Sequence, residues 1–289
     1  MFVQGTSGGR GAEGHGEGVR LLQRPMRRST PHPASAVIPT QYLRSVRLER
    51  NGVPSFDEYP FSLPAVRTLR ELDLHPEVTF LIGENGSGKS TLLEAIAVAW
   101  GFNAEGGSRN FRFATRSSHS ELFRHLSLVR GAGRPHDGYF LRAESFFNVA
   151  TEIERIDSAD HALLPPLGRP IRESYGGIAL HEQSHGESFF ALMTERFTGG
   201  GLYILDEPEA ALSPMRQMAA LVRIRDLVKM KSQFLIATHS PILMAYPGAR
   251  ILLLEEGGIR EVAYEDTEHY VVTREFLNNP RGMLRELMS

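Results

Sequence analysis

Nine consecutive residues combine glycines with one lysine and hydroxyl groups: Gly83, Glu84, Asn85, Gly86, Ser87, Gly88, Lys89, Ser90 and Thr91. They satisfy the pattern G-x-x-x-x-G-K-[ST], in which glycines let the backbone curl so that successive N–H groups point at phosphate oxygens. In that pattern Lys89 reaches the β- and γ-phosphates, and the hydroxyl of Ser90 ligates Mg²⁺. The sequence therefore predicts that these nine residues bind a nucleoside triphosphate together with Mg²⁺.

The residues on either side of this phosphate loop predict the elements that hold it. Residues 78–82 form a short, mainly apolar run that is typical of a buried strand. Residues 92–100 are rich in leucine, alanine and isoleucine, which predicts a helix packed in a core. A strand, a glycine-rich loop and a helix in this order are the setting that the motif requires.

A second segment supplies residue types that could act on a bound nucleotide. Residues 201–205 are apolar apart from their first glycine, and Asp206, Glu207 and Pro208 follow them. This pattern predicts a buried parallel strand with two carboxylates at its C-terminal end, the end that faces ligands in an open α/β sheet. We expect Asp206 to hold Mg²⁺ through its water shell and Glu207 to orient the attacking water. The alternative is a core strand that simply ends in an acidic turn.

A third segment repeats this design with a histidine at its tip. Residues 233–237 predict another buried strand, and Thr238, His239 and Ser240 follow it. His239 is expected to sense the γ-phosphate. An ordinary turn residue is the alternative, and the position of the segment behind the other two motifs favours the functional role.

Taken in order, the phosphate loop, residues 184–188 (Ser-His-Gly-Glu-Ser), the acidic pair and the Thr-His-Ser-Pro tip resemble the motifs of the ABC-type ATPases. The chain is most similar to the soluble RecF/SMC-like branch, as an AAA-family ATPase without a coiled-coil arm. The resemblance covers roughly residues 41–262. It implies that the protein hydrolyses ATP with Mg²⁺, that Lys89, Glu207 and His239 are catalytic, and that His239 is the switch histidine.

The resemblance also implies a homodimer that forms when ATP binds. In the family, a Ser-Gly-Gly-Gln-like signature of one protomer caps the nucleotide held by the other, and Ser184 and Gly186 take this role here. The sequence departs from the family pattern, since His185 replaces the first glycine and Glu187 replaces the glutamine.

Two further loops of the family can be placed on the sequence, although each departs from the family pattern at one residue. The D-loop falls on residues 210–213, where Ser213 stands in place of the aspartate of transporter subunits. The glutamine loop falls after the strand-like residues 139–141, where Glu144 stands in place of glutamine.

One competing motif overlaps the signature. His181, Glu182 and His185 satisfy the H-E-x-x-H pattern of zinc peptidases, which needs a helix and a third ligand from downstream. No third histidine follows at the required spacing, and Gly186 weakens a continuous helix. Both departures disfavour zinc catalysis. The chain also has no cysteine, which excludes cysteine-based structural zinc sites and disulfide frameworks.

The 289 residues, 41% of them hydrophobic, are enough to bury one large core. The expected fold is α/β: a P-loop NTPase of ABC-ATPase type, with a mainly parallel sheet core, an N-terminal antiparallel β portion and a small helical lobe. We expect residues 1–38 to form a disordered tail and residues 39–289 a single domain, with the lobe inserted at about 146–198. Strands are predicted at 43–48 and between 66 and 78, a closing hairpin at 251–259 and a capping helix at 273–288.

Charge and hydropathy bound the location and the partners. The formal charge of −2 gives no global affinity for nucleic acid, and no apolar run approaches the roughly 18 residues that a membrane span needs. We therefore expect a cytoplasmic protein with no membrane segment of its own. An arginine-rich run over residues 109–134, opposed by one glutamate, is either a solvated face or a docking surface for DNA or an acidic partner.

Three functions remain open from the sequence. The first is a soluble ATPase that couples ATP-driven dimerisation to DNA repair or genome defence, working with DNA or with a separately encoded nuclease. The second is the ATP-binding subunit of a membrane transporter. The third is an ATP-gated clamp or scaffold for a protein partner.

Overall fold

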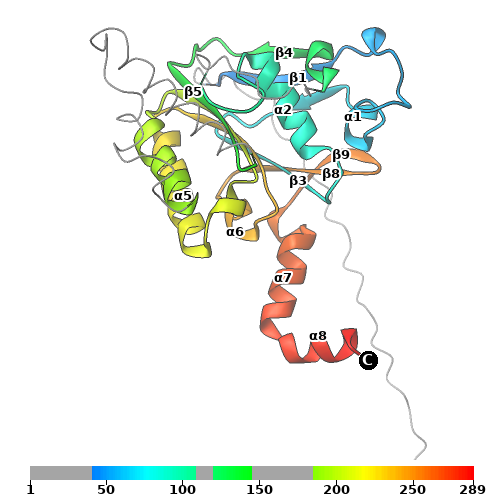
Figure 1. Cartoon of the computed structure of the whole chain (residues 1–289), viewed down its shortest axis with the longest axis vertical. Helices are drawn as coiled ribbons and strands as arrows, with labels where there is room; N and C mark the ends of the chain where they lie inside the picture. Colours follow the sequence, from blue (N-terminus) through cyan, green and yellow to red (C-terminus); the bar gives the residue numbers. More distant parts are fainter. Residues whose placement is uncertain (1–40, 109–119, 145–184) are drawn as a thin grey trace, which may run out of the picture. The chain divides into compact units, whose positions relative to one another are not determined.

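The computed structural model describes residues 41–108, 120–144 and 185–289, all of which fall in one unit, Val37–Ser289 (Figure 1). Within these residues, six strands form a central sheet in the order β5-β6-β7-β3-β8-β9. The strands are β3 (Val78–Gly83), β5 (Asp137–Arg142), β6 (Gly201–Asp206), β7 (Gln233–Ala237), β8 (Arg250–Glu255) and β9 (Gly258–Val262). The first five in the sheet order pair in parallel, and β9 pairs antiparallel with β8. The mainly parallel core and the closing hairpin are confirmed.

Every residue of β3, β6 and β7 is buried. These central strands are covered on both faces, which is why they appear in the sequence as nearly continuous apolar runs and not as an alternation of apolar and polar residues.

A second sheet, of three antiparallel strands, has the order β2-β1-β4. It contains β1 (Leu43–Leu48), β2 (Glu71–Asp73) and β4 (Leu126–Arg130). The predicted N-terminal antiparallel portion is thus confirmed. The expectation of strands from residue 66 onward is wrong in part, because Val66 belongs to the short helix α1 (Pro64–Arg67). Pro64 occupies the first turn of this helix, where its missing N–H and fixed φ favour helix initiation.

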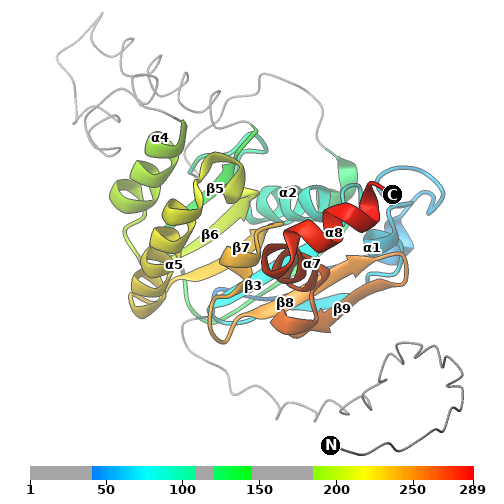
Figure 2. The same cartoon turned by 90° about the horizontal axis from the view of Figure 1, so that it is seen from below.

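Helices cover both faces of the central sheet. The helix α2 (Lys89–Trp100) lies between the two sheets, where Leu92 and Ile96 share a core with residues of β1, β6 and β7. On the other face, α5 (Pro214–Lys229) and α6 (Pro241–Met244) close a second core. The helix α4 (His185–Ala191) packs beside α5 (Figure 2) and continues into a π turn at Leu192–Arg196. Short 3-10 helices lie at Arg50–Gly52, Glu121–His125, Pro208–Ala211 and Tyr264–Asp266. The part of the predicted helical lobe from 185 to 196 is helical, and the rest of it up to residue 184 lies outside the described residues.

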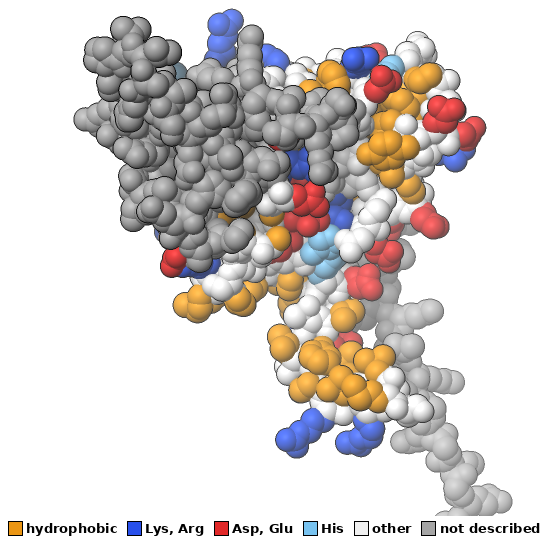
Figure 3. Space-filling model, in the orientation of Figure 1, with side chains coloured by type: hydrophobic (Ala, Val, Ile, Leu, Met, Phe, Trp, Pro, Cys, Tyr) orange, Lys and Arg blue, Asp and Glu red, His pale blue; other side chains and the backbone are white. Residues whose placement is uncertain are grey.

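The C-terminal segment differs from the single predicted capping helix. It forms two helices, α7 (Glu268–Asn278) and α8 (Pro280–Leu287), separated at Asn279. Pro280 has no N–H to continue α7, and the Asn279 side chain instead accepts a bond from Gly282 N, which starts α8. Neither helix, both being fully described, has a buried residue, and their exposed apolar side chains gather on one surface (Figure 3). None of the helices in the described part of the chain has the length and apolar character of a bilayer span.

A buried glutamine joins the two sheets. Gln233, at the start of β7, accepts hydrogen bonds from Tyr42 N (3.0 Å) and Leu43 N (2.9 Å) through Oε1. Its Nε2 donates to Leu43 O (2.8 Å) and His75 O (2.9 Å). One side chain therefore satisfies backbone groups next to both β1 and β3.

Replacing Gln233 by leucine should lower the free energy of unfolding by about 3 kcal/mol or more, because each buried group left without a partner costs about 1–3 kcal/mol. The two backbone N–H groups of Tyr42 and Leu43 are the most costly of these. Urea unfolding followed by circular dichroism measures the change. A loss below about 1 kcal/mol would mean that water or another side chain replaces the glutamine.

Candidate nucleotide-binding site

Three loops leave the central sheet at one edge. The strands β6, β7 and β3 are parallel neighbours, so their C-terminal ends lie side by side. The phosphate loop follows β3, Asp206 and Glu207 stand at the end of β6, and Thr238 and His239 follow β7. The fold thus brings together the three motifs that the sequence analysis treated as one site.

The phosphate loop depends on its glycines. Gly83, Gly86 and Gly88 have φ angles of 145°, 82° and 98°, values that residues with a Cβ rarely adopt. A Cβ on Gly83 would also lie 2.3 Å from the carbonyl oxygen of Leu254 in β8. The loop backbone is therefore pressed against the neighbouring strand before it turns into α2.

The first turn of α2 is available to an anion. No described side chain caps the helix, which begins at Lys89 after Gly88. Uncapped N–H groups and the positive end of the helix dipole favour negative charge at this position. The buried Ser87 hydroxyl beside them has no hydrogen-bond partner among the described residues. These features fit a phosphate group.

Lys89 is buried at the centre of the site. Its Nζ donates to Gly83 O and to Glu84 O, both at 2.8 Å. Burial lowers the pKa of Lys89, and the nearby carboxylates of Glu207 and Asp206 oppose this shift. A desolvated cation held by backbone carbonyls is suited to bind an anion that enters the loop.

Ser90 and Asp206 meet across the site, as the prediction of shared Mg²⁺ ligation requires. The Ser90 hydroxyl donates to Asp206 Oδ1 at 2.9 Å. Burial raises the pKa of Asp206 to about 6, although Arg142 and the bond from Ser90 act in the opposite direction. A desolvated carboxylate and a hydroxyl are oxygen donors of the kind that Mg²⁺ prefers.

The described residues contain no group of three or more histidine, aspartate or glutamate side chains that could enclose a metal. Mg²⁺ is usually held by one or two protein ligands together with substrate phosphates and water, so Ser90 and Asp206 alone would suffice as protein ligands. The H-E-x-x-H motif cannot be assessed in the same way, because His181 and Glu182 lie outside the described residues.

Arg142, at the end of β5, is a neighbour of this pair that the sequence analysis did not assign. Its guanidinium contacts Glu94 of α2 at 2.5 Å and lies 3.5 Å from Asp206 Oδ2. The sequence feature that could have identified Arg142 is its position at the end of a predicted strand, because the ends of parallel strands lie at the ligand-binding edge of a sheet. Glu144, the glutamine-loop candidate, is largely exposed and lies 3.7 Å from the same guanidinium.

Glu207 has an unusual backbone conformation. Its φ of 49° lies in the left-handed region, which costs a non-glycine residue about 1–3 kcal/mol. The conformation allows its N–H to donate to Ala237 O at 2.9 Å, while its side chain is partly exposed with Oε1 3.8 Å from His239 Nε2. The strain is thus used to bring this carboxylate beside the histidine.

Glu209 fixes the loop that carries His239. Its carboxylate accepts hydrogen bonds from Thr238 Oγ1 at 2.7 Å and from His239 N at 2.5 Å. Burial raises the pKa of Glu209. The residue belongs to the 3-10 helix Pro208–Ala211, so it ties the predicted D-loop to the histidine loop.

Two aromatic side chains near the site were also not assigned from the sequence. Tyr59 is 65% exposed, and its hydroxyl lies 3.3 Å from the hydroxyl of Thr91 in the first turn of α2. His269, in the first turn of α7, lies with Nε2 3.1 Å from His239 Nδ1. Both come from segments far from the motifs along the chain.

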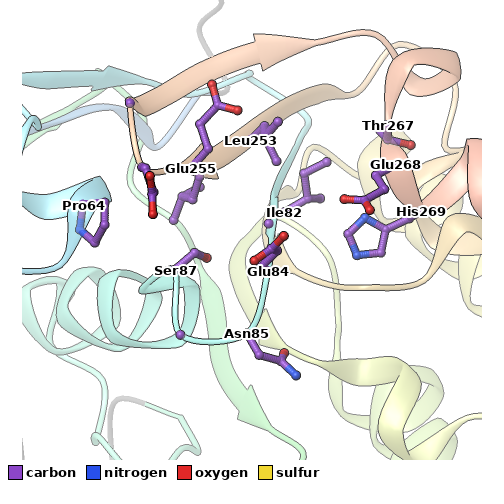
Figure 4. Close-up of a pocket in the computed structure, with 15 residues that line it drawn as sticks. Pro64, Ile82, Glu84, Asn85, Ser87, Leu253, Glu255, Thr267, Glu268 and His269 are labelled. Atoms are coloured by element: carbon purple, nitrogen blue, oxygen red, sulfur yellow. The ribbon is translucent and has the colours of Figure 1, made fainter.

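A cavity of about 590 Å³ adjoins the phosphate loop. Figure 4 shows Glu84, Asn85 and Ser87 of the loop on one wall, Leu253 and Glu255 of β8 on another, and Thr267 with the first two residues of α7, Glu268 and His269, on a third. Its carboxylates disfavour bare phosphate, so we expect the phosphates of a ligand to bind against the loop N–H groups and Lys89.

The predicted signature is described only in part. Ser184 lies outside the described residues, and Gly186 lies in the first turn of α4. None of the described residues that line the cavity beside the loop belongs to α4. The signature role of Ser184 and Gly186 therefore stays a prediction.

Two family models match the chain. One, described as "AAA domain", matches residues 61–149, and the other, described as "AAA domain, putative AbiEii toxin, Type IV TA system", matches residues 120–245.

Several curated relatives are named as import proteins. The ribose import ATP-binding protein RbsA 2 of Burkholderia cenocepacia is 28% identical over 235 residues, 73% of this chain and 44% of that protein. The hemin import ATP-binding protein HmuV of Pseudomonas fluorescens is 30% identical over 204 residues, 65% of this chain and 76% of that protein. The chain thus spans less than half the length of the ribose import relative.

A solved structure of a putative metal-chelate type ABC transporter in an inward-facing conformation is 16% identical, with a TM-score of 0.47. The similarity covers 81% of this chain and 88% of that one.

Proposed function

The chain belongs to the family of ABC-type P-loop ATPases, and from this premise we propose that it binds ATP with Mg²⁺ and hydrolyses the nucleotide as an ATP-dependent homodimer. The observation that carries the proposal is the junction of the phosphate loop with Asp206, Glu207 and His239 at one edge of the sheet. An anion cradle, oxygen ligands for Mg²⁺ and a carboxylate that can activate water are the parts that phosphoryl transfer to water needs.

Each residue has a stated role in this proposal. The loop N–H groups and Lys89 bind the β- and γ-phosphates, and Ser90 and Asp206 hold Mg²⁺, which neutralises phosphate charge when bound. Glu207 accepts a proton from the attacking water, and His239 donates a hydrogen bond to the γ-phosphate. Positioning and electrostatic stabilisation supply most of the rate enhancement in reactions of this class.

The homodimer completes the site. Ser184 and Gly186 of one protomer would cap the nucleotide that the phosphate loop of the other protomer holds. Closure of two protomers on two ATP molecules would then be the step that does mechanical work.

The process that closure drives is best assigned to DNA repair or genome defence in the cytoplasm. The family description that names a putative toxin of a type IV TA system supports a role in defence. The protein would act on DNA directly or through a separately encoded nuclease. A second candidate, the ATP-binding subunit of a transporter, is supported by the relatives that are named as import proteins.

ATP turnover with and without double-stranded DNA tests these proposals, together with the molar mass in ATP and in ADP by light scattering. DNA-stimulated turnover and an ATP-dependent dimer would support repair or defence. A dimer whose ATP turnover does not change with DNA but rises with a copurifying membrane protein would support the role of a transporter subunit. A chain that stays monomeric in ATP would contradict the homodimer.

We expect Tyr59 to stack on the base of the nucleotide, because it is an exposed aromatic ring anchored at the start of α2. Replacing Tyr59 by alanine should raise the KM for ATP about 5- to 100-fold with little change in kcat, because one base–aromatic stack contributes about 1–3 kcal/mol. Steady-state kinetics over a range of ATP concentrations measures both constants.

The matched control is Tyr59→Phe, which keeps the ring and removes only the hydroxyl that contacts Thr91. It should have nearly the wild-type KM. If phenylalanine weakens binding as much as alanine does, the hydroxyl and not the ring is the important group.

A further inference from the structure

The histidine of the loop after β7 is in contact with a second histidine, which lies in the first turn of α7. His239 Nδ1 and His269 Nε2 are 3.1 Å apart, a hydrogen-bond distance between two ring nitrogens. The other nitrogen of His239, Nε2, is buried and has no hydrogen-bond partner among the described residues. It points toward Glu207, whose Oε1 is 3.8 Å away. The three side chains form a connected series from Glu207 through His239 to His269.

His269 is held firmly at this point of the fold. Thr267, two residues before His269, is buried and caps α7 by accepting a hydrogen bond from Tyr270 N. Its hydroxyl donates to Tyr264 O at 2.8 Å, and the Tyr264 hydroxyl donates to Pro241 O of α6 at 2.9 Å. The start of α7 is therefore tied to the helix that directly follows the His239 loop.

The contact has one consistent arrangement of protons. Burial lowers the pKa of each histidine and Lys89 lowers both further, while Glu207 opposes the shift of His239 and Glu268 that of His269; the net downward shifts favour the neutral imidazoles. A neutral imidazole carries one N–H, and a carboxylate can only accept. A proton on Nε2 of His239 faces Glu207 favourably, whereas a lone pair there would face the carboxylate unfavourably. The Nδ1 atom of His239 must then accept, and His269 Nε2 must donate.

We propose that His269 is a positioning residue that fixes His239 in its Nε2–H tautomer, so that His239 offers a hydrogen-bond donor to Glu207 and to the terminal phosphate of a bound nucleotide. The inference rests on the proposed function for its consequence in catalysis, but not for the tautomer itself. Glu209 fixes the backbone of His239 and His269 fixes its ring, so the two contacts are complementary. The contact with His269 makes α7 part of the nucleotide site.

The tautomer can be measured without nucleotide. In the full chain labelled with ¹⁵N-histidine, NMR distinguishes protonated from unprotonated ring nitrogens, and the His239 signals are assigned by their loss in His239→Gln. We expect a protonated Nε2 and an unprotonated Nδ1 in the wild-type protein. A protonated Nδ1 with a bare Nε2 would overturn the proposal.

Two variants of His269 separate donation from packing. His269→Gln keeps an N–H donor and should keep the Nε2–H form of His239, whereas His269→Leu fills similar space without a donor and should populate the other tautomer. Circular dichroism and thermal melting check that both variants are folded. If His239 keeps a pure Nε2–H form in folded His269→Leu, then His269 does not set the tautomer.

The kinetic consequence should appear in kcat and not in KM. We expect His269→Leu to lower kcat about tenfold, the upper range for loss of one hydrogen bond, and His269→Gln to stay within about threefold of wild type. Equal loss in both variants would overturn the role in catalysis. A wild-type protein without ATP turnover would instead contradict the proposed function, while the NMR result would still decide the tautomer.

Discussion

Replacing Glu207 by glutamine is expected to leave ATP binding intact and to lower ATP turnover by about 10²–10⁴-fold, the range for loss of a general base. Glutamine has nearly the same shape, but its amide cannot accept the proton of the attacking water. The phosphate loop, Lys89 and the Ser90–Asp206 pair are unchanged in this variant, so the ground-state contacts to the nucleotide remain. Phosphate release and the dissociation constant for ATP, measured on the same preparation, give the two quantities.

The variant should also accumulate as a dimer in ATP, because the nucleotides that hold the protomers together are not consumed. Glu121→Gln is a matched control, since Glu121 is an exposed residue whose ion pair with Arg124 lies on the surface. It should show wild-type turnover. Wild-type turnover in Glu207→Gln would show that another group activates the water. Loss of ATP binding would show that Glu207 contributes to binding ATP before the reaction.

The parts of the site that lie next to strand ends were predictable from the sequence. A buried parallel strand has a distinct signal, a short apolar run, and the residues that follow it must lie at the ligand-binding edge of the sheet. This is why residues 78–91, 201–207 and 233–239 could be placed together before the structure was known. The glycine positions had an equally local cause, since positive φ angles are a property of single residues.

The parts that depend on contacts between distant segments were not predictable. His269 is 30 residues from His239, and no periodicity or motif relates the two. Arg142 is 48 residues from Glu94, and Tyr59 is 32 residues from Thr91. Such pairs meet only because the order of strands in the sheet folds their segments onto one edge, and strand order is not encoded in any local pattern.

Two wrong predictions of secondary structure concern segments in which a nearby proline indicates the observed helix boundary. The apolar pattern between residues 66 and 78 predicted a strand at Val66, whereas Pro64, two residues earlier, favours the start of a helix. The sequence analysis expected one helix over residues 273–288, although Pro280 lies within that range. In both cases a helix of the structure begins at the proline, which the apolar pattern alone does not predict.

Replacing Lys89 by methionine is expected to weaken ATP binding about 100-fold or more, because charge-assisted hydrogen bonds to phosphate contribute about 1.5–3 kcal/mol each. Methionine has a similar length and fills the same buried space, so packing of the loop is retained. Stability without nucleotide should change less than affinity, because the variant removes a buried charge whose desolvation is unfavourable as well as its bonds to Gly83 O and Glu84 O. Calorimetric titration with ATP and a thermal melt of the free protein measure the two effects.

The chain offers a close control, because it has only three lysines and the other two lie outside the site. Lys229→Met changes an exposed lysine in the last turn of α5 and should bind ATP like the wild type. If Lys89→Met loses stability as severely as affinity, then the lysine mainly holds the loop in shape through the two carbonyls. If Lys89→Met loses affinity for ATP but not stability, then the main role of Lys89 is to bind the phosphates, and its bonds to the two carbonyls only orient the side chain.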